Sequence, residues 1–437
     1  MASQKDGEKG DLQTLGERTL QKVKWHLIPF AFLLYFFNNM DRVNIGYAAL
    51  QMNKALNITS VQFGMITSFF FISYFVFQIP SNMMAQRIGI RKWIPTIIII
   101  WGLITGITFF AHNATFVIWV RFLLGIAEAG FFPGMIYYFT LWFPARERAE
   151  ATSLFMMAIA ASTIFASPIS GWIVEHGMLG GYEGWRWLFA FEGVITVILG
   201  VIAIFVFTNR PQEARWLADD EKRWLVNELQ SEQKDKKETA KISIGQLLTN
   251  GRLWRLVLIY MFIQAAGQAA SFWLPSIVKG FSKTFSDTGV GVIMMFPYIL
   301  AAIAMPFWAR HSDRTKERRY HAAIPMLLAG LAFIILMCTS NVAIKVIALL
   351  IFGIGSLSFY GPYWTFPPAL LAPEAIAAGV AIINSGSSIG AFGSNYIIGF
   401  ISGSAWGIQG VYLFEALLCL VSFVLMITLR AKGKERV

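Results

Sequence analysis

The chain alternates long apolar runs with short polar connections, and this pattern predicts an all-α membrane protein. Each run holds about twenty residues, enough for one helix to cross a hydrocarbon layer roughly 30 Å thick. Hydropathy indicates about twelve such runs. The first set lies at 26–50, 61–84, 93–111, 115–141, 149–174 and 187–208, and the second at 253–279, 288–309, 321–341, 343–367, 375–402 and 407–429. Strands of a membrane barrel would be about ten residues long with alternating polarity, so that class does not fit.

The longest hydrophilic segment, residues 208–251, divides the apolar runs into two equal sets. The stretch from Glu213 to Gln233 within it has a helical composition with apolar residues on one face, which predicts a surface helix. The predicted parts of the chain are a cytoplasmic N-terminal segment (1–25), an N-terminal six-helix bundle (26–208), a cytoplasmic linker with a surface helix (209–252), a C-terminal six-helix bundle (253–429) and a cytoplasmic tail (430–437).

The net charge of +11 follows membrane topology rather than a nucleic-acid partner. With both termini cytoplasmic and the helices alternating in direction, nearly all lysines and arginines outside the helices fall on the cytoplasmic side. The exceptions are Lys54, Arg186, Lys279, Lys283 and Lys345. The positive-inside rule therefore predicts a multi-pass protein of the inner (plasma) membrane with both termini in the cytoplasm. No zinc spacing or nucleic-acid-binding motif accompanies the charge, so no nucleic-acid partner is expected.

Short basic segments recur at corresponding places in the two sets of helices. Gln86–Lys92 follows the second predicted helix, and Asp313–Arg319 follows the eighth. Gly125-Ile126 in the fourth helix similarly corresponds to Gly353-Ile354 in the tenth. Duplicated halves with a substrate site between them, near the middle of the membrane, are a known transporter design. The repeat therefore predicts a transporter built from two pseudo-symmetric six-helix halves.

The six-plus-six layout and the repeated basic segments resemble the major facilitator superfamily, and the resemblance covers nearly the whole chain. Three stretches are more specifically similar to its anion:cation symporter family, namely Asn39–Asn44, Gln78–Asn82 and Arg121–Gly134. That family includes bacterial permeases for sugar acids, tartrate and aromatic acids, and animal sialic-acid and phosphate carriers. The resemblance implies the major facilitator fold and transport of an organic anion.

The resemblance also implies that charged residues of the repeated segments gate the carrier. These residues are Arg87, Arg91, Asp313, Arg314 and Arg318. The chain departs from the superfamily pattern at Gln86, where an acid normally helps to latch the cytoplasmic ends in the outward-open state. Asp313 retains the acid in the second half, so the departure puts only the first latch in doubt.

Four charged residues lie inside the first and fourth apolar runs, where an uncompensated charge is costly and a functional role is the default expectation. They are Asp41, Arg42, Arg121 and Glu128. From a rise of about 1.5 Å per residue, Arg42 and Arg121 lie at similar depth and Glu128 lies closer to the cytoplasm. Asp41 and Arg42 point about 100° apart on one helix, so each needs a partner elsewhere.

Glu128 is the first candidate for a proton-coupling carboxyl, and Asp41 is the second. Burial favours a neutral carboxyl and an approaching arginine favours an ionised one, so such a group can switch during transport. Similar family members place an essential protonatable carboxylate at the position of Glu128. Asp41 is expected to form a salt bridge with Arg121 in the empty carrier. The alternatives are a permanent Arg–Glu pair that fixes helix packing and a static contact of Asp41 with a neighbouring helix.

Arg42 and Arg121 are the candidate ligands for an organic anion, because a guanidinium stays charged and matches the planar geometry of a carboxylate. Arg121 is a candidate for either of two roles, substrate binding or relay. The side chains expected to complete the site are Tyr74, Tyr360, Tyr363, Trp364, Asn384 and Ser385. Ordinary packing at helix interfaces is the alternative for each aromatic residue.

These features predict a proton-coupled symporter that imports an organic anion, such as a sugar acid, a tartrate-like diacid or an aromatic acid, by alternating access. The alternatives are a proton-antiporting exporter of drugs or amphipathic metabolites and a non-transporting nutrient receptor. No nucleophile–base or metal constellation indicates an enzyme. No cofactor or metal is expected. Protons are the expected coupling ion, with sodium as an alternative, and a monomer is the family default.

Overall fold

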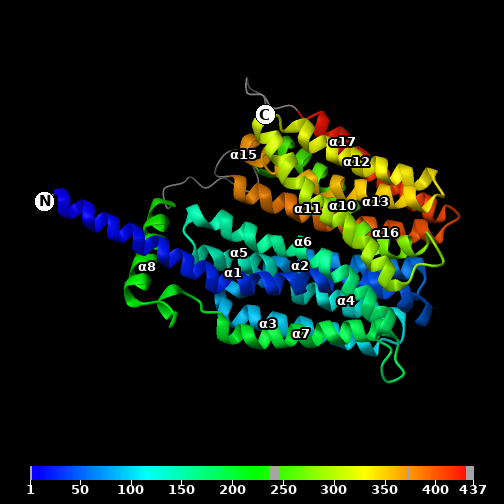
Figure 1. Ribbon diagram of the computed structural model, residues 1–437, viewed down its shortest axis with the longest axis horizontal. Coiled ribbons are helices and arrows are strands. Elements are labelled where there is room, and N and C mark those ends of the chain that lie inside the picture. Colours follow the sequence, from blue (N-terminus) through cyan, green and yellow to red (C-terminus); the bar gives the residue numbers. More distant parts are fainter. Residues whose placement is uncertain (1, 237–246, 372–374, 430–437) are drawn as a thin grey trace.

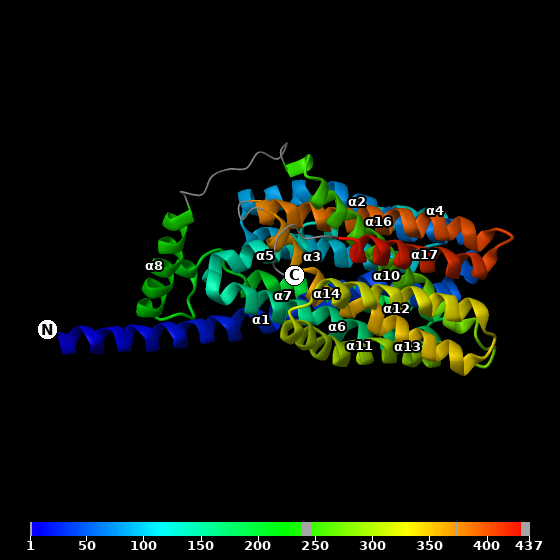
Figure 2. The same ribbon diagram turned by 90° about the horizontal axis from the view of Figure 1, so that it is seen from above.

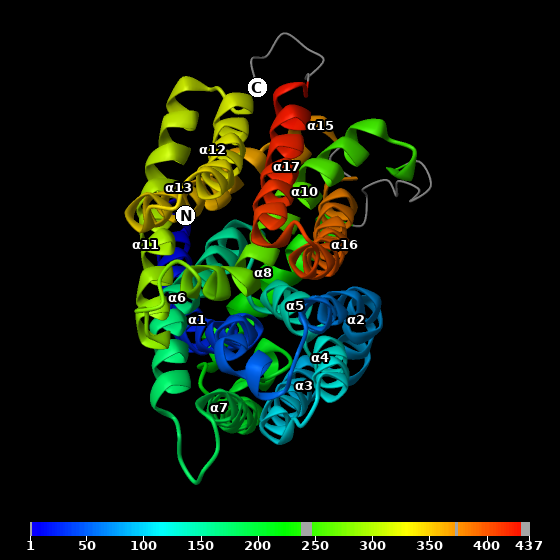
Figure 3. The same ribbon diagram turned by 90° about the vertical axis from the view of Figure 1, so that its right-hand side faces the viewer.

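The computed structural model describes residues 2–236, 247–371 and 375–429, and the regular structure within these ranges is helical. The helices form two bundles that lie side by side with roughly parallel axes (Figures 1 and 3). The first half of the chain forms one bundle and the second half forms the other. The predicted tail at 430–437 lies outside the described residues, as do residues 237–246 of the predicted linker.

The N-terminal bundle consists of α1 (Ala2–Ala55), α2 (Ser60–Ile88), α3 (Ile90–Ile107) with the short helix η1 (Thr108–Phe110), α4 (Ala114–Glu128), α5 (Phe131–Trp142), α6 (Ala145–His176) and α7 (Gly184–Val206). The run predicted as one helix at 115–141 is thus divided into α4 and α5 by a turn directly after Glu128. Gly130 in this turn packs so closely on α2 that a Cβ would lie 1.9 Å from the Ser81 hydroxyl. The turn therefore places Glu128 at a fixed point between α2 and the rest of the bundle.

The second half begins with η2 (Pro211–Glu213) and α8 (Asp219–Lys236), which lie in the predicted linker. The C-terminal bundle consists of α10 (Gly251–Lys279), α11 (Asp287–Thr315), α12 (Arg319–Cys338), α13 (Val342–Ser358), α14 (Tyr360–Tyr363), α15 (Phe366–Leu370), α16 (Ile376–Gly403) and α17 (Gly407–Ile427). The run predicted at 343–367 is divided into α13, α14 and α15. Pro362 and the pair Pro367-Pro368 lack backbone donors and favour such interruptions.

Ten helical segments of the described residues are long and apolar enough to cross a membrane. α1 and α16 are not among these ten, but both run along the same bundles (Figure 2). α1 packs on α6 and α7, and α16 packs on α2 and α10. α1 carries Asn38, Asn39, Asp41 and Arg42 near the middle of the bundle, which reduces its hydropathy. The chain is therefore a multi-pass membrane protein with an all-α fold of two helical halves.

The two bundles contact each other mainly along three helix pairs, α2 with α16, α6 with α11 and α1 with α10. Small residues allow the first two pairs to approach closely, as is usual between membrane helices. A Cβ on Gly64 of α2 would lie 2.8 Å from the Gly399 Cα of α16. A Cβ on Gly291 of α11 would lie 2.3 Å from the Ser167 carbonyl oxygen of α6. Both contacts lie toward the end of the molecule remote from α8.

Polar contacts join the two halves at this same end. Gln51 Nε2 of α1 donates to Asp287 Oδ2 of α11 at 3.2 Å. The Thr288 backbone N–H, in the first turn of α11, donates to Glu175 Oε2 of α6 at 2.8 Å. Toward the other end, α1 and α5 contact α8 instead. The structure is therefore closed between the halves at the end remote from α8.

Candidate functional site

Three helices of the N-terminal bundle bring charged side chains together in its interior. The residues are Asp41 and Arg42 of α1, Arg121 and Glu128 of α4, and Glu192 of α7. Asp41 and Arg121 are 1% exposed, and Glu128 and Glu192 are fully buried. The four residues predicted to carry chemistry thus lie in one cluster, together with a fifth that the sequence argument did not consider.

Glu128 forms an ion pair with Arg42. Arg42 Nε donates to Glu128 Oε2 at 2.9 Å, and Asn38 Nδ2 donates to the same oxygen at 2.8 Å. The guanidinium of Arg42 also lies over the ring of Tyr74, with 4.7 Å between its central carbon and the ring centroid. Its Nη2 is buried and has no hydrogen-bond partner among the described residues. Arg42 is therefore only partly satisfied by Glu128.

Arg121 lies beside this pair but bonds to the main chain. Its Nη1 donates to the Asp41 carbonyl oxygen at 3.4 Å, and its Nη2 donates to the Arg42 carbonyl oxygen at 3.5 Å. The ring of Phe70 lies under the guanidinium, 4.9 Å from it. The expected salt bridge between Asp41 and Arg121 is not among the ion pairs of the described residues, because the Asp41 carboxyl faces other donors. Arg121 pairs with neither carboxylate predicted as its partner.

The Asp41 carboxyl faces α3 and α7. Trp101 Nε1 donates to Asp41 Oδ2 at 2.5 Å, and the Thr196 hydroxyl donates to the same oxygen at 3.4 Å. Glu192 lies one turn before Thr196 on α7 and accepts a short hydrogen bond from Asn44 Nδ2 of α1. Glu192 was missed, although it is an acid inside the apolar run 187–208. The rule that selected Asp41 and Glu128 would also have selected Glu192.

The C-terminal half contributes rings, hydroxyls and an amide. The Tyr360 hydroxyl donates to Gln264 Oε1 at 2.7 Å, and Tyr360 is half-buried. The Tyr363 hydroxyl donates to the Leu256 carbonyl oxygen at 2.8 Å, and Tyr363 is fully buried. Trp364 packs edge-on against Tyr260, with 5.1 Å between the ring centroids. Tyr363 therefore serves packing, whereas Tyr360 is accessible in part.

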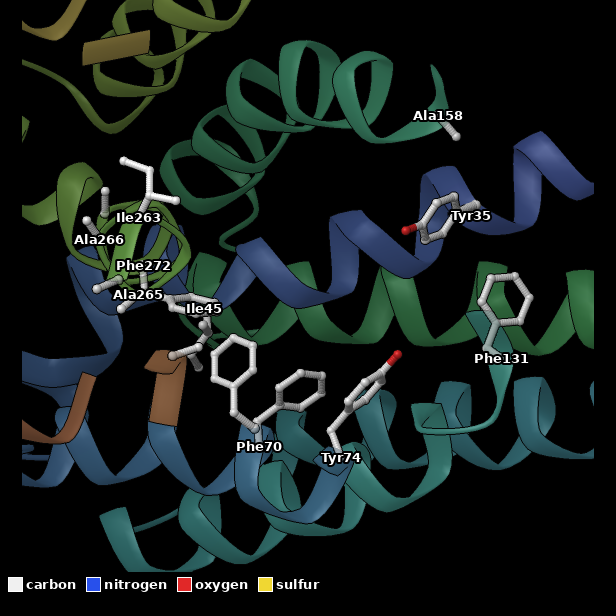
Figure 4. Packing of buried hydrophobic residues seen from close by; sticks show 14 of the residues in the cluster. Tyr35, Ile45, Phe70, Tyr74, Phe131, Ala158, Ile263, Ala265, Ala266 and Phe272 are labelled. Carbon is white, nitrogen blue, oxygen red and sulfur yellow. The ribbon is translucent and has the colours of Figure 1, made fainter. Parts of the chain in front are cut away.

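Two tyrosines of the N-terminal half lie near Arg42. Tyr74 packs against its guanidinium, and Tyr35 lies two turns before Arg42 on the same helix, α1. Figure 4 shows Tyr74 pointing from α2 toward α1, and Tyr35 extending from α1. Tyr35 was not predicted as a site residue, because a single tyrosine in an apolar helix has no distinguishing sequence signal. The arrangement places phenol groups of α1 and α2 near one guanidinium, while Tyr360 of α14 pairs with Gln264.

Asn384 and Ser385 of α16 are not part of the hydrogen-bonded cluster. Asn384 is exposed and Ser385 is half-buried. The buried amide of α16 is instead Asn395, whose Oδ1 accepts a hydrogen bond from Trp273 Nε1 at 3.2 Å. The choice between Asn384 and Asn395 depends on which helix face meets α10, and hydropathy alone does not fix that face.

The predicted gating residues lie at the end of the molecule nearer α8. Arg87 ends α2, and Arg91 lies in the first turn of α3; both are exposed. Asp313 pairs with Arg318 within the turn between α11 and α12, and Arg314 is exposed. These contacts are local to each half, as expected where the halves are not closed on each other.

A paired-bundle membrane fold with a buried charge cluster near its middle defines a transporter of small molecules. The Major Facilitator Superfamily model matches residues 31–394, so the chain belongs to this superfamily. The resemblance seen in the sequence is confirmed, and the chain is a transporter rather than an enzyme.

Relatives extend over the whole chain. A protein of Agrobacterium vitis described as a putative tartrate transporter is 41% identical over 424 residues, which are 97% of this chain and 94% of that protein. The putative metabolite transport protein NicT of Pseudomonas putida is 34% identical, with 95% of each chain covered. The xylose transporter XylE from E. coli, in a partially occluded inward-open conformation, matches with a TM-score of 0.73 and 15% identity over 94% of this chain and 99% of that one. The last match shows the fold alone.

Proposed function

We propose that the chain is a proton-coupled symporter that imports a small organic carboxylate across the inner membrane. The observation that carries this proposal is that the Arg42 guanidinium is only partly paired. Its Nε holds Glu128, while its buried Nη2 has no partner and its side chain is 21% exposed. A guanidinium with one free edge can donate two parallel hydrogen bonds to a carboxylate. A substrate anion and Glu128 therefore compete for the same arginine.

The competition supplies the coupling. While Glu128 is ionised it neutralises Arg42, and a second anion at Arg42 then meets like-charge repulsion. Protonation of Glu128 removes this repulsion and frees Arg42 for the substrate. A proton and an anion are thus bound together, and loss of the proton expels the anion. The proton gradient drives the cycle in the inward direction, and the membrane potential contributes only where the bound protons outnumber the negative charges of the anion.

The predicted topology assigns the two ends of the molecule. With both termini in the cytoplasm, the closed end at Gln51, Glu175 and Asp287 faces outward, and the end that carries α8 faces inward. The contacts between the halves are then those of a carrier closed to the outside, with Glu128 paired to Arg42.

The shape of the site favours hydroxylated acids. Tyr35 and Tyr74 offer phenol groups near Arg42, and Tyr360 and Gln264 form a polar pair in the other half. Phenol and amide groups pair with the hydroxyls of a substrate such as a tartrate-like diacid or a sugar acid. The relative described as a putative tartrate transporter supports beginning with that class.

Uptake into proteoliposomes tests the proposal. The purified chain is reconstituted and given an inward proton gradient by a pH jump, with a panel of labelled aldonates, uronates, tartrates and aromatic acids. Accumulation of one class that disappears when a protonophore collapses the gradient is expected. Accumulation that follows a sodium gradient instead would refute proton coupling. Binding without flux would indicate a receptor, and efflux of amphipathic compounds would indicate an exporter.

A further inference from the structure

The buried cluster contains two more carboxyls than the proposed coupling uses. Asp41 and Glu192 lie together between α1 and α7: Asp41 accepts from Thr196, one turn after Glu192, and Glu192 accepts from Asn44, one turn after Asp41. Two ionised carboxylates are unfavourable so close together in a medium of low polarity, because neither can donate and their charges repel.

The hydrogen bonds of the two carboxyl groups are incomplete by one hydrogen. Asp41 Oδ2 accepts from Trp101 and Thr196, and one Glu192 oxygen accepts from Asn44. The remaining oxygens, Asp41 Oδ1 and Glu192 Oε1, are buried without a partner among the described residues. Buried polar atoms are rarely left unpaired. A single hydrogen between the two carboxyls satisfies both.

The charges around the two carboxyls also indicate one bound proton. The donors from α1, α3 and α7 are all neutral, and α4 contributes Arg121 and Glu128. With Arg42, the cluster has two arginines and three carboxyls. With every carboxyl ionised it would carry a net charge of −1, and with one shared proton it is neutral. Neutrality is the state that a buried cluster in hydrocarbon favours.

We propose that Asp41 and Glu192 form a carboxyl pair that holds one exchangeable proton, so that Glu192 is a third coupling carboxyl beside Glu128 and Asp41. The inference rests on the proposed function for its role in transport, but the shared proton itself does not. When the pair gives its proton to water, one carboxyl O–H bond breaks and a second negative charge remains. That charge attracts Arg121, whose guanidinium now rests on the carbonyl oxygens of Asp41 and Arg42.

Infrared spectroscopy of the full-length protein tests the pair without transport. A protonated carboxyl gives a carbonyl stretch distinct from that of a carboxylate. The wild type is expected to lose such a band reversibly on titration to alkaline pH. In Glu192→Gln the amide donates to Asp41 and no proton is needed, so the part of the band that belongs to the pair is expected to be lost, while any part from Glu128 or Glu415 remains. An unchanged titrating band in Glu192→Gln would overturn the proposal.

Two further variants keep the test decisive. Asp41→Asn is expected to remove the same band, since either carboxyl alone stays ionised beside an amide. It replaces Glu192→Gln if that variant does not fold. Glu415→Gln is the matched control, because Glu415 is a buried carboxyl of the other half, 2% exposed, on α17. It is expected to leave the titration of the pair unchanged.

A transport measurement then assigns the role. Glu192→Gln is expected to keep substrate counterflow within about twofold, because its amide state matches the neutral, protonated cluster. Its accumulation under a proton gradient should fall by about tenfold per pH unit, the value of one coupled proton. Full accumulation in Glu192→Gln would overturn the coupling role. Failure of the wild type to transport any acid would count against the proposed function. The shared proton would then be tested by the infrared measurement alone.

Discussion

The two halves share a fold but surround the centre of the molecule with different chemistry. The N-terminal half contributes Arg42, Arg121 and three buried carboxyls. The C-terminal half contributes Gln264, Tyr260 and Tyr360, which form neutral hydrogen bonds and ring contacts. A duplicated architecture has thus diverged, so that one half holds the charge cluster and the other contributes neutral polar groups and rings. Substitutions in the first half should change coupling and affinity, whereas those in the second should change selectivity.

The largest expected effect is that of Glu128→Gln. The amide keeps a hydrogen bond to Asn38 or Arg42 but cannot release a proton, so Arg42 stays free for the substrate throughout the cycle. Counterflow is expected to persist, while accumulation falls by about tenfold for each pH unit of gradient. Labelled uptake and counterflow in the same liposomes measure both. Accumulation by the variant equal to that of the wild type would show that Glu128 is not the coupling group.

Arg42→Lys should weaken binding more than Arg121→Lys. An ammonium is a single point charge and cannot hold Glu128 and a carboxylate in the planar geometry of a guanidinium. We expect a loss of affinity of about tenfold or more for Arg42→Lys, equal to at least ~1.4 kcal/mol. Arg121 donates only to main-chain oxygens, so Arg121→Lys should change affinity by a smaller factor. Titration calorimetry measures both affinities. A larger loss for Arg121→Lys than for Arg42→Lys would make Arg121 the main substrate ligand.

Tyr360→Phe tests whether the C-terminal half determines substrate selectivity. It removes a half-buried hydroxyl that bonds to Gln264, at a net cost of about 1 kcal/mol. A change in preference of roughly fivefold between a hydroxylated acid and its deoxy analogue is expected, with proton coupling unchanged. Tyr363→Phe is the matched control, because the Tyr363 hydroxyl is committed to the Leu256 carbonyl oxygen. Equal effects of the two variants would remove Tyr360 from the site.

The sequence was sufficient for the architecture and for the charges on α1 and α4. Apolar run length identifies membrane helices because the hydrocarbon layer sets their length. Intramembrane charge identified Asp41, Arg42, Arg121 and Glu128 because an unpaired charge in that layer is costly. The same argument covers Glu192 and Glu415, which were not considered.

The pairing within the cluster could not be obtained from the sequence. It depends on how α1 is rotated against α4 and α7, and this rotation arises from packing contacts such as Tyr35 on Phe155, with 4.4 Å between ring centroids. Depth along a helix placed Asp41 near Arg121, but rotation turned its carboxyl to Trp101 and Thr196. The burial of Asn395 in α16, like the exposure of Asn384, depends on helix rotation in the same way.

The smallest expected effect concerns α8, which docks on the N-terminal half. Lys22 Nζ of α1 donates to Glu221 Oε2 at 2.8 Å, and the Ala218 backbone N–H donates to the same oxygen at 2.9 Å. Burial alone would raise the pKa of Glu221, but these hydrogen bonds and the charge of Lys22 hold it below its ordinary value of 4.5. A lowered carboxyl pKa stabilises the folded state above the ordinary pKa, and the contribution disappears as pH falls through the folded-state value.

Glu221→Gln tests this contact because it keeps the oxygen that accepts from Ala218 and removes only the charge. Lys22 is 42% exposed, so solvent screens the pair and the loss at neutral pH should stay below about 1 kcal/mol. Thermal unfolding in detergent should show a small decrease in Tm at neutral pH and none at acid pH, where wild-type Glu221 is also protonated. A decrease of the same size at both pH values would mean that the charge contributes nothing. Uptake should be unaffected, because this contact lies at the edge of the half whose interior holds the coupling charges.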